Sequence, residues 1–242
     1  MFVKWKLNSI IYTNEVVFIK IDILSLFPDF FNGIINESII KRAIDKKIVE
    51  INIINFRDFS PLPNKQVDDT PYGGGAGMLL RCEPIFLTLD KIRTKDSHVI
   101  LLSPEGGAYN QRVADRLKEY KHLIIICGHY EGFDERIKTQ VDEIISIGDF
   151  VLTGGEIAAM AIIDSVVRLI PGVINEASLE NESFNNNLLD YPQYTKPAEY
   201  RGLVVPDVLL SGNHQRIAEY RKKEQIKKTK DLRPDLMEDK DE

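Results

Sequence analysis

The sequence predicts an α/β protein built on a mostly parallel sheet with helices on both faces. Two strongly apolar runs support this prediction, His122 to Cys127 and Glu143 to Ile147, and they end at Gly128 and Gly148. Short apolar runs bounded by glycine are typical of central strands in parallel sheets, because such strands are buried on both faces. Along the rest of the chain, strand-like segments alternate with segments of helical periodicity, as in βαβ units.

Length and composition are those of a soluble globular protein. The 242 residues are 43% hydrophobic, enough for one large domain or two smaller ones. A formal net charge of -6 argues against a nucleic-acid-binding surface over the whole protein but allows a local basic patch. Two cysteines, Cys82 and Cys127, are too few for a disulfide framework or a zinc site, which fits a reducing, cytosolic setting. No apolar run approaches the roughly 18 residues of a membrane helix.

The N-terminal part is expected to alternate strand and helix. Phe18–Phe27 and Val49–Phe56 carry the apolar pattern of strands, and a helix is expected over Pro28–Asp45. The following segment, Arg57–Leu80, is polar and irregular and ends in PYGGGAGM. A loop of that length inside a compact domain is usually functional. Its glycines lack the Gly-Lys-Ser/Thr of a nucleotide-triphosphate loop, so that function is excluded.

Strand and helix continue to alternate through the middle of the chain. The expected elements are a strand at His98–Ser103 and helices at Glu83–Arg93, Tyr109–Tyr120 and Glu156–Ile170. Thr153 and Glu156 have the spacing of a capping box, in which each side chain bonds a free backbone N–H at the start of the helix, here Glu156–Ile170. Pro171 and Gly172 would end that helix.

The glycines are unevenly distributed. Of the 15 glycines, 11 fall between Gly73 and Gly155. Glycine lets the backbone approach a ligand closely, and ligands of open α/β sheets bind where the strands end. The clustering therefore predicts several loops around one small molecule. The alternative is that each glycine is an ordinary turn residue.

The composition changes after Gly172. Asn175–Asn187 is polar and rich in asparagine and glutamate, which predicts a flexible linker. Ser211–Lys230 is expected to be helical, with the stretch Ser211–His214 as its N-terminal cap. From His214 to Arg233 there are eight Lys or Arg and three Asp or Glu, a net charge of +5. Such a helix contacts phosphates or simply presents a solvated face.

Seven sequence blocks, in order, carry a resemblance to a known family. They are PYGGGAGM (71–78), LLSPEGG (101–107), CGHYEGFDERI (127–137), SIGDFVLTGGE (146–156), DSVVRLIPGV (164–173), LLDYPQYTKP (188–197) and VPDVLLSGNHQRI (205–217). Together they resemble bacterial tRNA (guanine-N1)-methyltransferases of the SPOUT superfamily, over residues 18–236. Residues 1–17 fall outside the resemblance and are expected to be an N-terminal extension, because the family usually begins where Ile19 stands here.

The resemblance implies both a fold and an activity. Residues 18–174 would form a catalytic domain whose C-terminal trefoil knot binds S-adenosylmethionine. Residues 175–187 would be the linker and residues 188–242 a small helical domain that binds tRNA. The chain would be a cytoplasmic homodimer without membrane or DNA partners, and would methylate N1 of the guanosine immediately 3′ of the anticodon.

By the same resemblance, three strand exits form the methyl-donor site. Their backbone N–H and C=O groups would bond an adenine and a ribose, and their glycines would leave room for the ligand. The implied residues are Leu102, Ser103, Pro104, Gly128, Tyr130, Glu131, Ile147, Gly148, Asp149, Phe150, Val151, Leu152, Gly154 and Gly155. Core packing is the alternative for Tyr130 and Leu152. His129 lies beside the site and is given no catalytic role.

Methylation of guanine N1 requires a base for the departing proton and a cation for the charge that develops on the exocyclic oxygen. The resemblance places the cation at Arg168, which alternatively pairs with Asp164 four residues earlier on the same helix. The family's base is an aspartate in a DSF triplet. This sequence has Glu182 there, whose extra methylene moves the carboxylate by about 1 to 1.5 Å. Glu180 and Asp190 are the alternative bases.

The metal requirement and two competing functions stay open at this stage. Magnesium is associated with the family's chemistry, but no group of acids with metal-ligand spacing stands out in the sequence. One competing hypothesis is a non-catalytic RNA-binding protein in which Glu182 marks the loss of the base. The other is a SPOUT methyltransferase that acts on another nucleoside or on a ribose 2′-OH.

Overall fold

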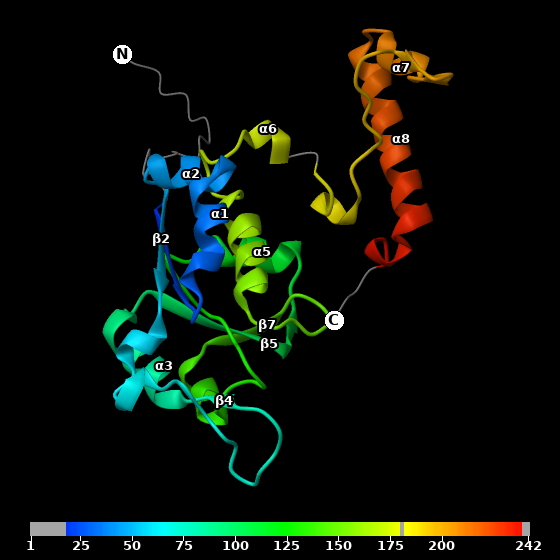
Figure 1. The fold of residues 1–242 in the computed structure, drawn as a ribbon. Helices are drawn as coiled ribbons and strands as arrows, with labels where there is room; N and C mark the ends of the chain where they lie inside the picture. Colours follow the sequence, from blue (N-terminus) through cyan, green and yellow to red (C-terminus); the bar gives the residue numbers. More distant parts are fainter. Residues whose placement is uncertain (1–17, 180–181, 239–242) are drawn as a thin grey trace, which may run out of the picture. The chain divides into compact units, whose positions relative to one another are not determined.

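The computed structural model describes residues 18–179 and 182–238 of the chain (Figure 1). The chain divides into two compact units, with the boundary between Ile174 and Asn175. We call residues 18–174 the N-terminal unit and the described residues from 175 onward the C-terminal unit. The predicted extension, residues 1–17, lies outside the described residues.

The N-terminal unit is built on a five-stranded sheet in which every neighbouring pair is parallel. In sheet order the strands are β2 (Val49–Ile54), β1 (Ile19–Leu24), β6 (His122–Ile126), β5 (Ser97–Ala108) and β7 (Glu143–Ser146). The predicted parallel sheet is confirmed. All residues of the central strand β6 are buried, as its unbroken apolar run indicated.

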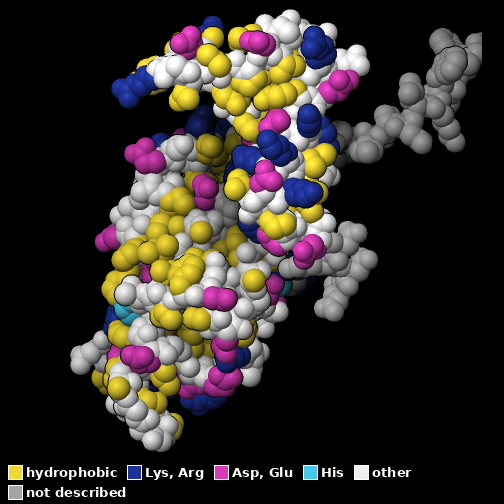
Figure 2. All heavy atoms as spheres, turned by 90° about the vertical axis from the view of Figure 1, so that its right-hand side faces the viewer, with side chains coloured by type: hydrophobic (Ala, Val, Ile, Leu, Met, Phe, Trp, Pro, Cys, Tyr) yellow, Lys and Arg dark blue, Asp and Glu magenta, His cyan; other side chains and the backbone are white. Residues whose placement is uncertain are grey.

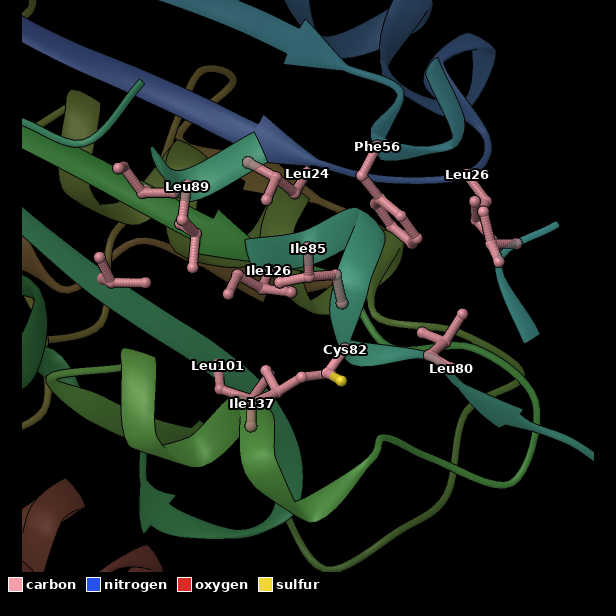
Figure 3. Packing of buried hydrophobic residues seen from close by; sticks show 13 residues of the cluster. Leu24, Leu26, Phe56, Leu80, Cys82, Ile85, Leu89, Leu101, Ile126 and Ile137 are labelled. Carbon is pink, nitrogen blue, oxygen red and sulfur yellow. The ribbon is translucent and has the colours of Figure 1, made fainter. Parts of the chain in front are cut away.

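Helices accompany this sheet. They are α1 (Asn32–Asn36), α2 (Ser38–Asp45), α3 (Cys82–Ile92), α4 (Gln111–Leu117) and α5 (Glu156–Val167). On one face, Ile85 and Leu89 of α3 pack with Leu24, Leu101 and Ile126 of the strands (Figure 3). Side chains alternate along a strand, so the neighbouring strand residues point to the opposite face, where they are buried as well.

The helix predicted over Pro28–Asp45 is broken. A 3-10 helix (Pro28–Phe31) and α1 are separated from α2 by Glu37, whose backbone is extended at φ -127° and ψ 155°. Ser38 follows with a positive φ of 51°. This break turns α2 so that Ile40 and Ala43 are buried. Burial of the α2 face thus overrides the continuous helical pattern of the sequence.

The strand predicted to end at Ser103 continues to Ala108. Leu102 and Gly107 of β5 both pair with Ile145 of β7, so the extra residues form a bulge. The bulge requires a close approach, because a Cβ at Gly106 would lie 2.5 Å from the backbone nitrogen of Ile145. Pro104 and two glycines read as strand breakers in the sequence, which is why the prediction ended too early.

The segment predicted to be irregular, Arg57–Leu80, contains short elements. It holds 3-10 helices at Phe56–Phe59 and Pro63–Lys65 and a hairpin of β3 (Asp68–Asp69) and β4 (Leu79–Leu80). The PYGGGAG sequence forms the loop of this hairpin, which extends away from the sheet (Figure 1). Gly73, Gly74, Gly75 and Gly77 all have positive φ, a conformation in which glycine is unstrained.

The C-terminal unit is mostly helical. It contains α6 (Glu176–Leu179), a 3-10 helix (Asn185–Asn187), a hairpin of β8 (Glu199–Tyr200) and β9 (Leu203–Val204), α7 (Asp207–Leu210), α8 (His214–Leu232) and a 3-10 helix (Pro234–Leu236). The side chain of Asn213 accepts a hydrogen bond from the backbone N–H of Arg216 at 3.1 Å, which confirms the predicted cap. None of the helices in the described part of the chain has the length and hydropathy needed to cross a membrane.

Candidate functional site

A cavity of about 210 Å³ lies at the carboxyl ends of β6 and β7 and beside Leu102–Pro104, where the bulge in β5 begins. This is the edge at which open α/β sheets bind ligands. Its lining residues are Leu102, Ser103, Pro104, Gly128, His129, Tyr130, Glu131, Gly132, Phe133, Ile145, Ser146, Ile147, Gly148, Phe150, Val151, Leu152, Thr153, Gly154, Gly155 and Ala158. Three segments that are far apart in the sequence therefore meet around one space.

The cavity contains every residue predicted for the methyl-donor site except Asp149, which does not line it. The residues that line the cavity without having been predicted are His129, to which no catalytic role was given, Gly132, Phe133, Ile145, Ser146, Thr153 and Ala158. His129 and Phe133 could have been predicted from the sequence, because they belong to the same CGHYEGF block as the predicted residues. Ala158 lies inside α5, where the sequence shows only a helical pattern.

A glycine turn closes one side of the cavity. The backbone N–H of Gly155 donates to the carbonyl of Gly128 at 2.8 Å, and Gly154 forms an isolated β-bridge with His129. A Cβ on Gly155 would lie 2.8 Å from the Cα of Cys127. Only glycine allows this approach, so the turn that precedes α5 is fixed against the end of β6.

The predicted capping box at the start of α5 is wrong. Gly155 is the N-terminal cap of the helix and no side chain caps it. Glu156 is only 3% exposed, and its Oε1 accepts a hydrogen bond from Ser25 Oγ at 2.7 Å. The glutamate turns inward because Ser25, just after β1, offers a buried donor there. Its negative charge also lies at the helix N-terminus, where the helix dipole stabilises it.

The aromatic side chains at the cavity are accessible. Tyr130 is 43% exposed, so core packing, the alternative for this residue, is wrong. Its backbone has a positive φ of 59°, and its ring contacts that of His129 edge-on with centroids 4.8 Å apart. Leu152 is half-buried, whereas Val151 is 85% exposed. The cavity thus combines backbone polar groups with accessible apolar side chains.

Cys127, the residue before the cavity residue Gly128, is buried. Burial raises the pKa of its thiol well above 9.0, and the nearby charge of Glu156 raises it further. The thiol is therefore protonated at neutral pH and is not a nucleophile. Within residues 18–179 and 182–238, no group of three or more His, Cys, Asp or Glu side chains gathers as a metal site.

The predicted general base, Glu182, and the predicted cation, Arg168, are not among the residues that line this cavity. Arg168 caps the C-terminal end of α5, where its backbone N–H donates to the carbonyl of Asp164 at 3.2 Å. Its side chain is half-buried. Arg168 belongs to the N-terminal unit and Glu182 to the C-terminal unit.

The Glu182 segment is held by hydrogen bonds within the C-terminal unit. Ser183 Oγ accepts from the backbone N–H of Asp190 at 3.0 Å, and the N–H of Phe184 donates to the carbonyl of Leu188 at 2.6 Å. The carbonyl of Glu182 accepts from the N–H of Asn185 at 3.3 Å. These bonds fix the triplet against the segment that follows it. Glu180, one of the alternative bases, lies outside the described residues.

Comparison with known proteins identifies similar chains. The family model "tRNA (Guanine-1)-methyltransferase TrmD" matches residues 19–239. A tRNA (guanine-N(1)-)-methyltransferase of Malacoplasma penetrans is 60% identical over 217 residues, covering 90% of this chain and 96% of that protein. One from Mycoplasmopsis synoviae is 54% identical over 220 residues, covering 90% and 97%. One from Geobacillus kaustophilus is 54% identical over 225 residues, covering 91% and 92%.

Proposed function

The chain belongs to the tRNA (guanine-1)-methyltransferase family and is an enzyme of that class, and we propose that it methylates N1 of the guanosine immediately 3′ of the anticodon in tRNA. The observation that carries this proposal is the cavity at the carboxyl ends of β6 and β7 and beside the bulge of β5, together with a family match that spans both units. The proposed methyl donor is S-adenosylmethionine.

The residues around the cavity suit that donor. The glycine exits leave backbone N–H and C=O groups accessible, and these can bond the adenine edge and the ribose. The exposed apolar groups can cover the flat ring. When bound, the donor supplies a methyl group on a sulfonium centre. The chain's own part is to orient that methyl toward the acceptor and to exclude water from it.

In the proposed reaction the guanine N1 must lose its proton as it accepts the methyl group. Glu182 acts as the base and takes this proton on its carboxylate. Arg168 stabilises the negative charge that develops on the exocyclic oxygen. The hydrogen bonds around Ser183 and Phe184 support this role, since they hold the Glu182 backbone in one conformation.

The architecture proposed with this function has a trefoil knot at the C-terminal part of the 18–174 domain. The helical domain at 188–242 would bind tRNA, chiefly through the basic helix α8. Residues 175–187 would link the two domains. We propose a homodimer that acts in the cytoplasm.

The test is methyl transfer from donor to an unmodified tRNA transcript, followed by digestion and mass spectrometry of the nucleosides. We expect 1-methylguanosine, mapped to the position immediately 3′ of the anticodon. Another methylated nucleoside would point to a related methyltransferase of different specificity. No transfer by folded protein that takes up the donor in titration calorimetry would point to a non-catalytic RNA-binding homologue.

A further inference from the structure

A second hollow lies within the C-terminal unit. This groove has a volume of about 670 Å³, within the range of pockets that hold small ligands. It lies between the segment that follows Asp190 and helices α7 and α8. Its lining residues are Tyr191, Pro192, Gln193, Tyr194, Thr195, Lys196, Pro197, Ala198, Val205, Leu209, Leu210, Ile217 and Arg221. No part of the methyl-donor cavity contributes to it.

The charged side chains that line this groove are all positive. Lys196 and Arg221 line it, and none of its lining residues is acidic. Helix α8, which supplies Arg221, lies in a stretch with a net charge of +5, although the whole chain carries -6. Figure 2 shows Lys and Arg side chains gathered beside hydrophobic ones in the part of the surface that α8 forms. Positive charge without acids favours a polyanion over a protein segment.

The groove also presents aromatic surface. The guanidinium carbon of Arg221 lies 4.8 Å from the ring centroid of Tyr191, a cation–π contact that holds both side chains. Tyr194 is 49% exposed, so part of its ring is open to a ligand. Leu209 and Ile217 add half-buried apolar side chains to the lining. Proteins that bind single-stranded nucleic acids use aromatic rings interleaved with cations, because the bases stack on the rings while the phosphates contact the cations.

We propose that this groove binds one unstacked nucleobase of the tRNA, with its ring on Tyr194 and its phosphate near Lys196 and Arg221. The inference rests on the proposed function, because tRNA is the only polyanion which that function supplies. Unstacked bases occur in the single-stranded loops of tRNA, so the base comes from a loop. The groove thus recognises one loop nucleotide in addition to the guanosine that is methylated.

The experiment measures tRNA affinity of the full-length protein by fluorescence anisotropy. Replacing the ring in Tyr194→Leu should weaken binding about 5- to 100-fold, the range for loss of one stacked base. Tyr194→Phe keeps the ring and should bind like the unmodified protein. The matched control is Tyr200→Leu, because Tyr200 is an exposed tyrosine of the same unit that does not line the groove. It should change affinity less than twofold.

A scan of abasic substitutions then locates the base. One loop position should weaken binding by the unmodified protein as much as Tyr194→Leu does, and Tyr194→Leu should lose nothing further with that RNA. The salt dependence of binding should stay the same in this variant, since no phosphate contact is removed. The proposal is overturned if Tyr194→Leu binds tRNA with normal affinity, or if every abasic RNA loses as much affinity for the variant as for the unmodified protein. It is also overturned if the Tyr194→Leu substitution changes the oligomeric mass of the protein.

The two proposals fail in different ways. Methyl transfer to the complete tRNA by the unmodified protein is measured in the same preparation. No transfer refutes the proposed function. Normal transfer, combined with normal binding by Tyr194→Leu, refutes only the groove.

Discussion

Glu182 is the residue on which the proposed proton transfer depends. Glu182→Gln removes the carboxylate but nearly preserves size, so single-turnover methylation should slow about 100-fold or more. Donor affinity measured by calorimetry should stay unchanged, because the residues that line the cavity all belong to the N-terminal unit and Glu182 belongs to the C-terminal unit. Glu182→Asp, which restores the family's residue, is the matched control and should keep most of the rate. A fast Glu182→Gln would refute this role, and a slow Asp190→Asn would then move it to Asp190.

Asp22 is a buried carboxylate with a structural role. His122 Nε2 donates to it at 2.9 Å, Asn52 Nδ2 donates at 2.9 Å, and Lys20 Nζ lies 2.8 Å away. Burial raises the pKa of Asp22, but these three partners outweigh burial and leave the pKa below 3.8. The network stabilises the fold above the unfolded pKa of about 3.9 and is lost as the pH falls through the lower folded pKa.

Acid unfolding tests this network. The free energy of unfolding of the unmodified protein should fall as the pH drops below about 4, and the fall should be smaller in Asp22→Asn, which does not titrate. At pH 7 Asp22→Asn should cost about 1 to 3 kcal/mol, because buried donors lose a charged acceptor. Urea titrations at several pH values measure both effects. Parallel pH profiles of the two proteins would contradict the assignment.

At the scale of elements, the cavity depends on how closely the turn before α5 approaches the end of β6. Gly155→Ala places a Cβ 2.8 Å from backbone atoms of Cys127 and Gly128, which side-chain movement cannot relieve. We expect a loss of about 1 to 3 kcal/mol of stability from this overpacking. Donor affinity should fall at least tenfold, because the turn lines the cavity. Calorimetry and thermal unfolding measure the two changes.

The control for this change is Gly33→Ala. Gly33 lies in α1, has no heavy atom within 4 Å of an added Cβ, and does not line the cavity. Alanine favours helix over glycine by about 0.5 to 1 kcal/mol, so this variant should be unchanged or slightly more stable. Equal behaviour of the two variants would show that the close approach at Gly155 does not matter.

At the scale of the whole molecule, the N-terminal unit leaves large apolar side chains exposed. They are Phe27, Phe30, Phe150, Val151 and Ile157 among others. Exposed apolar surface of this kind marks interaction sites and supports the proposed homodimer. Light scattering at micromolar concentration should give twice the mass of one chain. Ile157→Lys should shift the equilibrium toward monomer, whereas Leu203→Lys, at an exposed residue of the C-terminal unit, should not.

Local patterns predicted the sheet because its strands are short apolar runs with glycine at their ends. The unbroken apolar run of β6 predicted a buried strand, and every residue of this strand is buried in the structure. Patterns failed where a distant partner decides the outcome. The extension of β5 past Pro104 and the burial of Glu156 each depend on a contact with a remote segment. Asp149 stands between cavity residues in sequence but does not line the cavity.

The sequence by itself determined the fold class, the parallel strands, and, through its seven blocks, the family of the chain. Those features follow from residue type and spacing, which are local. Only the tertiary structure decided that Ser25 binds Glu156, that Gly155 meets Cys127, and that Tyr191 and Arg221 line one groove. The physical reason is that each of these contacts joins residues far apart in the chain, and close packing, unlike periodicity, leaves no trace in the intervening sequence.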